Sequence, residues 1–69
     1  MSLTIETERE ADGRWVAEIS DLPGVLAYGS DRAEALRACQ SLALRVIADR
    51  LEHGEPVPEA VLRAFSPAA

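Results

Sequence analysis

Apolar and polar residues alternate along the first part of the chain. The alternation runs over about residues 2–9 and returns over about residues 14–20. A period of two is typical of a strand that buries one face, so both segments are expected to be strands. Asp12 and Gly13 lie between them, and such a pair favours a tight turn because these residues tolerate the backbone angles of a chain reversal. The pattern predicts a β-hairpin.

A second turn and a third strand follow. Pro23 fixes its own φ and lacks an amide donor, and Gly24 can adopt conformations closed to other residues, so residues 21–24 are expected to form a turn. The next strand is predicted over about residues 25–29. It shows no clean alternation, which indicates that both of its faces contact apolar surface.

One long amphipathic helix is predicted over about residues 32–53. Asp31 and Glu34 have the spacing of a capping box, in which the cap side chain accepts a free backbone N–H. Gly54 is expected just past the last turn, where glycine most often ends a helix. The apolar positions recur every three or four residues, as expected of a helix that covers a sheet. They are Ala35, Leu36, Cys39, Leu42, Ala43, Val46 and Ile47.

The tail allows two interpretations. Residues 60–65 favour a further strand at the sheet edge, and a short helix beginning near Pro58 is the alternative. With the strand, residues 1–69 form a single α+β domain of two layers. Its order is β-β-β-α(-β), with an antiparallel sheet covered on one face by one long helix.

Size and charge limit the classes of function that are expected of this chain. With 69 residues and one cysteine, the chain has a small core and no internal disulfide, so a homo-oligomer, a dimer or tetramer, is expected. A net charge of -5 argues against nucleic-acid binding, which draws its affinity from clustered cations. No segment has the pattern of a signal peptide or a membrane span, so a cytoplasmic protein without membrane contact is expected.

The order of these signals resembles the HicB-like antitoxin family. The resemblance rests on R-W-V-A-E-I at 14–19, D-L-P-G-V at 21–25, G-S-D-R-A-E-A-L at 29–36 and H-G-E-P-V-P at 53–58, and it covers roughly residues 3–60. It implies a truncated RNase H-like fold that oligomerises and blocks a small basic toxin ribonuclease, HicA-like in type. Family members usually add a C-terminal DNA-binding domain; no segment of that kind is recognised in residues 1–69, so direct nucleic-acid binding by this domain is not expected.

The candidate binding residues lie on one side of the predicted sheet. If Ala17 and its alternating neighbours face the helix, then Val16, Leu26 and Tyr28 face away from it, with Glu18 beside them. Packing against the helix does not explain apolar residues on the uncovered face of the sheet. They are interpreted either as a toxin-binding surface or as a surface covered by a second copy or by the C-terminal tail.

No catalytic residue, metal or cofactor is predicted. Cys39 falls in the apolar stripe of the helix, and His53 lies one turn after Asp49 at the helix end, where it would interact with the helix dipole. Glu6, Glu8 and Glu18 are expected on a solvated sheet face. Two alternatives to the antitoxin remain: an oligomeric scaffold without a toxin, and a metal-dependent nuclease that uses these glutamates.

Overall fold

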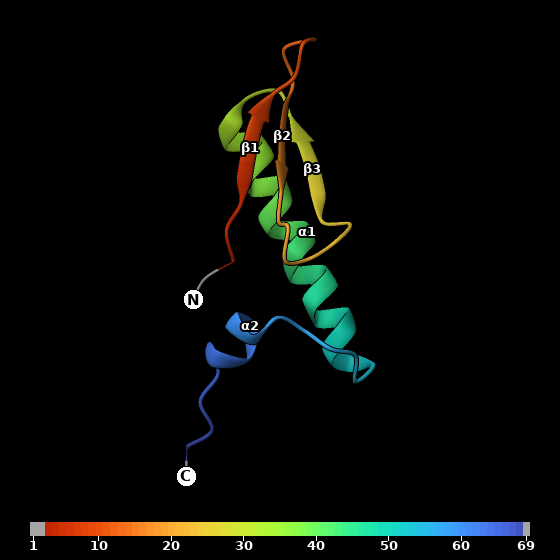
Figure 1. Ribbon diagram of the computed structural model, residues 1–69, viewed down its shortest axis with the longest axis vertical. Helices are drawn as coiled ribbons and strands as arrows, with labels where there is room; N and C mark the ends of the chain where they lie inside the picture. Colours follow the sequence, from red (N-terminus) through yellow and green to blue (C-terminus); the bar gives the residue numbers. More distant parts are fainter. Residues whose placement is uncertain (1–2, 69) are drawn as a thin grey trace.

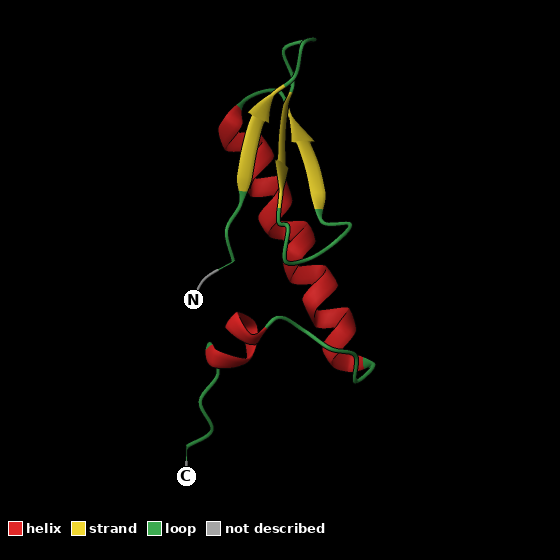
Figure 2. Cartoon of the chain, in the orientation of Figure 1, coloured by secondary structure: helices red, strands yellow, loops and turns green. Residues whose placement is uncertain are grey.

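The chain folds into a three-stranded antiparallel sheet followed by one long helix and one short helix (Figures 1 and 2). The computed structural model describes residues 3–68. The elements are β1 (Glu6–Arg9), β2 (Trp15–Glu18), β3 (Leu26–Gly29), α1 (Arg32–Glu52) and α2 (Glu59–Arg63). This arrangement confirms the predicted α+β fold with β-β-β-α order.

The strand β2 is the centre of the sheet. It pairs antiparallel with β1 on one side and with β3 on the other, so Ala17 lies between Thr7 and Ala27. Ala17 is fully buried, and α1 packs along this face of the sheet (Figure 1). The strand predicted over residues 2–9 is shorter in the structure. It begins at Glu6, and residue 2 lies outside the described residues.

The predicted hairpin turn is present. Gly13 has φ of 91°, and its amide donates to the carbonyl of Glu10 at 3.0 Å. The carboxylate of Asp12 accepts from the backbone amide of Arg14 at 3.0 Å and from its Nε at 2.8 Å. The backbone hydrogen bond from Arg14 lowers the pKa of the Asp12 carboxyl below its ordinary value of 3.8, and the Arg14 side chain adds to the effect.

Acid should therefore weaken this turn. A carboxyl whose pKa is lower in the folded state stabilises that state above its unfolded pKa, and the contribution is lost as the pH falls through the folded pKa. We expect the NMR titration of Asp12 to have its midpoint below 3.8. In Arg14→Ala, where the arginine side chain is lost but the amide remains, we expect a smaller shift in the same direction. A midpoint at or above 3.8 in the wild type would contradict the turn geometry.

The second turn does more than reverse the chain. Gly24 has φ of 90°, which confirms the need for glycine there, and the amide of Val25 donates to the carbonyl of Leu22 at 3.0 Å. Leu22 is fully buried in the core, although the sequence predicts only a structural turn at this point. The turn is therefore anchored by an apolar side chain that closes one end of the sheet–helix interface.

The helix α1 begins and ends close to the predicted positions. The amide of Glu34 donates to Asp31 Oδ1 at 2.7 Å, and the carboxylate of Glu34 accepts from the amide of Ser30 at 3.2 Å. At the other end Gly54 has φ of 67°, and the amide of Glu55 donates to the carbonyl of Arg50 at 2.8 Å, a Schellman arrangement. The buried stripe consists of Ala35, Cys39, Ala43 and Ile47.

The tail forms a helix, so the predicted strand over residues 60–65 is wrong and the alternative that begins near Pro58 is right. Pro58 is the N-cap of α2, and Arg63 pairs with Glu59 at 2.8 Å one turn apart. Only Val61 of α2 is buried. A helix the length of α1 carries the chain about 30 Å, past the end of the short strands, so the tail emerges where no strand edge is available (Figure 1).

None of the helices in the described part of the chain has both the length and the apolar character of a membrane span.

Candidate functional site

The face of the sheet opposite α1 carries alternating side chains from all three strands. Val16 lies between Glu8 and Tyr28, and Glu18 lies between Glu6 and Leu26. Directly paired residues of neighbouring strands point to the same side, and Ala17 between these two rows points to α1. We call this surface the open face; it consists of Glu6, Glu8, Val16, Glu18, Leu26 and Tyr28.

The open face has an apolar part along β2 and β3. Leu26 is 40% exposed and Tyr28 is 46% exposed, and Val16 between the strands is half-buried. The guanidinium of Arg14 lies over the ring of Tyr28 at 4.6 Å from its centroid, and its Nε pairs with the carboxylate of Asp12 at 2.8 Å. The predicted binding residues Val16, Leu26 and Tyr28 therefore lie together on one face, as the two-residue period of neighbouring strands predicts.

The open face has an acidic part along β1 and β2. Glu6 is the direct cross-strand partner of Glu18, and Glu8 lies one row further along. All three are exposed, and none of them takes part in an ion pair within residues 3–68. Like charges directly opposite each other destabilise a sheet slightly. A cation from another molecule would relieve this repulsion.

The C-terminal tail does not cover the open face. The helix α2 lies beyond the end of the sheet (Figure 1). Its residues line a hollow together with Leu3, Leu44 and Ile47. The interpretation in which the tail shields Val16, Leu26 and Tyr28 is therefore wrong. The missing alternation in β3 has another explanation: Val25 and Ala27 face α1, whereas the outward side chains Leu26 and Tyr28 have no cover within the described chain.

The glutamates of the sheet do not form a group with metal-binding geometry. Among the described residues, the one trio of potential ligands whose atoms lie within 4.8 Å of each other is Asp49, His53 and Glu55, and all three are exposed. His53 Nδ1 lies 2.7 Å from the carbonyl oxygen of Asp49 and 3.4 Å from its Oδ1. This is the helix-end interaction that the sequence predicts for His53.

Cys39 occupies the predicted place in the core. Its side chain is fully buried between α1 and the sheet, and burial raises the pKa of the thiol, with a smaller contribution from the charge of Glu18. A thiol with a raised pKa is a poor nucleophile and a poor metal ligand. Cys39 is therefore a packing residue.

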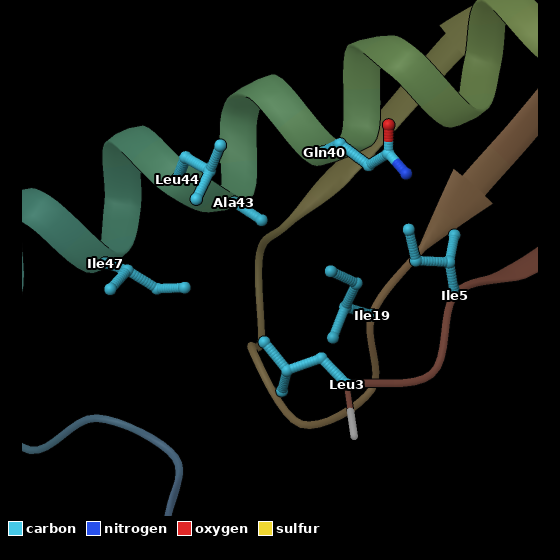
Figure 3. A pocket seen from close by; sticks show the side chains of 7 residues that line it. All are labelled: Leu3, Ile5, Ile19, Gln40, Ala43, Leu44 and Ile47. Atoms are coloured by element: carbon cyan, nitrogen blue, oxygen red, sulfur yellow. The ribbon is translucent and has the colours of Figure 1, made fainter. Parts of the chain in front are cut away.

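A second apolar surface was not predicted from the sequence. It is a groove between the segment that precedes β1, the middle of α1, and α2. One hollow of about 390 Å³ is lined by residues from the first two and by Ile19, which follows β2. A second hollow of about 410 Å³ continues from it to α2. Figure 3 shows Leu3, Ile5 and Ile19 facing the side chains of α1 across the first hollow. We call the two hollows together the end groove.

Comparisons of the chain with models of protein families, with curated proteins and with solved structures find no match. The two surfaces themselves are therefore the basis for a proposal about function.

Proposed function

We propose that this protein is a binding module of the antitoxin type, similar to HicB-like antitoxins, whose open face masks the active surface of a small basic ribonuclease. One observation carries the proposal. Val16, Leu26 and Tyr28 form an uncovered apolar surface directly beside Glu6, Glu8 and Glu18, three exposed carboxylates without an ion pair in residues 3–68. The proposal carries no catalytic role for any of these residues.

The chemistry of the open face suits a cationic partner. An enzyme that cleaves RNA needs cations around its active site to hold the phosphates of its substrate. A surface with clustered carboxylates attracts such a protein over a distance and speeds the encounter. The apolar residues then supply the contact that slows dissociation, because burying aromatic and aliphatic side chains contributes most of the affinity of an interface.

The open face is also suited to cover the active surface of a partner, because it is stiff and can be part of a larger interface. A sheet of three strands backed by one helix is a stiff surface, so little conformational entropy is lost when a partner docks on it. A stable interface uses about 20–30 residues on each side, so the partner would extend beyond the six residues of the open face onto the hairpin turn and the edge of β3. An RNA phosphate cannot reach cations that are covered in this way.

Affinity capture tests the proposal. The full chain, immobilised through a C-terminal tag, is incubated with extract of the cells that produce it, and bound proteins are identified by mass spectrometry. We expect a short protein of high isoelectric point that is released by raised salt. The same protein, purified, should cleave RNA alone and stop cleaving at equimolar ratio with this chain.

Two results would contradict the proposal. Recovery of the chain alone would favour the oligomeric scaffold. RNA cleavage by the purified chain itself with magnesium or manganese, lost in Glu6→Gln or Glu18→Gln, would instead favour the nuclease.

A further inference from the structure

The chain exposes more surface than a compact protein of its mass. Its accessible surface is 4987 Å², whereas a compact monomer of this mass exposes roughly 4200 Å². Its radius of gyration is 13.6 Å and its extents are 50 × 22 × 16 Å, against about 11 Å expected for the radius at this length. The excess of roughly 800 Å² is close to what one partner contributes to a standard protein interface.

The two most exposed of the described large apolar side chains lie at the end groove. Leu44 is 68% exposed and Phe65 is 71% exposed, and both line the second hollow. The helix α2 is held to the rest of the molecule mainly through Val61, which is buried in the core, so a hollow remains between α2 and α1. Side chains of this size are normally buried, and a contiguous exposed group marks an interaction site.

We propose that the end groove is the interface at which two copies of this chain associate around a twofold axis. The lack of charge in the end groove favours a second copy of the chain as its occupant. Among residues 3–68, those that line one or the other hollow are apolar except for Gln40, and none of them is ionisable. Two copies of a chain with net charge -5 repel each other through most of their surfaces, and this uncharged groove is a surface where they meet without placing carboxylates opposite each other.

A basic partner fits the end groove less well than a second copy does. Such a partner gains affinity from carboxylates, and these lie on the open face and not in the lining of the groove. The end groove and the open face share no residue. The proposal is therefore independent of the proposed function, and a dimer formed through the groove leaves both open faces accessible.

A twofold interface at the end groove needs an exposed group beside a hollow, because the same surface of each copy contacts the other. Phe65 is 71% exposed and lines the second hollow together with Leu3, Leu44 and Ile47. We infer that Phe65 of each copy inserts into the hollow of the other, where an aromatic side chain buries more area than any aliphatic residue does.

Sedimentation equilibrium of the full chain tests the inference. We expect the wild type to have a mass of twice 7.4 kDa at micromolar concentrations. Leu44→Glu and Phe65→Glu should each weaken association about 100-fold, because each places a charge in a desolvated interface. Both side chains are exposed in the single chain, so both variants should fold, which circular dichroism checks. The matched control is Leu26→Glu, which places the same charge on the open face and should leave the dimer intact.

Isotope-filtered NMR on a mixture of labelled and unlabelled chains provides a second measurement. We expect intermolecular contacts between the Phe65 ring and the methyl groups of Leu3 and Leu44. A wild type that remains monomeric at 7.4 kDa would overturn the inference, as would a dimer that Leu44→Glu and Phe65→Glu leave unchanged or that Leu26→Glu disrupts equally. None of these results would affect the capture of a basic partner, so the two proposals fail separately.

Discussion

We expect the replacement of Gly29 by alanine to remove a large part of the stability of this domain. Gly29 ends β3 and is buried against the start of α1, and an added Cβ would lie 2.9 Å from the Cα of Ala35 and still closer to its amide nitrogen. These are backbone atoms, so no side-chain rotation relieves the overlap, and α1 must move away from the sheet. We expect a cost of about 3 kcal/mol or more, against a total stability of roughly 3–10 kcal/mol for a chain of this length.

Urea unfolding followed by circular dichroism measures this cost, with Gly54→Ala as the matched control. Gly54 has φ of 67°, and an added Cβ there meets no atom within 4 Å, so this substitution costs only the left-handed backbone conformation, about 1–2 kcal/mol. We expect Gly29→Ala to have the lower urea midpoint by a wide margin. Equal midpoints for the two variants would mean that β3 and α1 do not approach each other as closely as described.

The second large effect concerns the open face. We expect the double variant Leu26→Ser, Tyr28→Ala to bind the basic partner about 100-fold more weakly than the wild type, because it removes two exposed apolar side chains at the centre of the docking surface. Both residues are on the uncovered side of the sheet, so the fold should persist. Isothermal titration calorimetry with the captured partner measures the affinity.

The matched control for this variant is Leu44→Ser, which removes a leucine that is more exposed than Leu26 from the end groove. It should leave partner affinity unchanged while weakening self-association. If Leu44→Ser weakens partner binding as much as the double variant does, the partner binds at the end groove and the assignment of the two surfaces is wrong.

The glutamates of the open face should affect the rate of association more than the rate of dissociation. Exposed charges steer the encounter, and their contribution is screened by salt. We expect the triple variant Glu6→Gln, Glu8→Gln, Glu18→Gln to associate about 10-fold more slowly at low salt, with the difference shrinking as salt is raised. Surface plasmon resonance at several salt concentrations measures both rates. If the triple variant lost affinity only through faster dissociation, with its association rate unchanged, a steering role would be contradicted.

The strands, both turns and α1 could be predicted because local signals agree there with the tertiary contacts. The helix predicted over residues 32–53 is α1 at Arg32–Glu52, since Asp31 caps one end and Gly54 terminates the other. The tail could not be predicted in this way. Residues 60–65 satisfy both a strand and a helix pattern, and the choice depends on where α1 delivers the chain relative to the sheet, which no local pattern encodes.

The open face and the end groove also differ in how far local sequence patterns predict them. Val16, Leu26 and Tyr28 follow from strand alternation, so the open face could be predicted once the side covered by α1 was known. The end groove joins residues at opposite ends of the sequence, such as Leu3 and Phe65. One local signal does exist: Leu44 adds an apolar residue beside the stripe that faces the sheet, which makes the apolar surface of α1 wider than one interface needs.

Docking of a basic protein on the open face of the sheet is the proposal on which the function rests. Amide hydrogen exchange of this chain, free and in complex with the captured partner, is the decisive test of it. We expect slowed exchange in β3 and in the hairpin around Asp12 and Gly13, with the exposed side of α1 at Arg37 and Ser41 unchanged. Slowed exchange along that side of α1, with β3 and the hairpin unchanged, would contradict it.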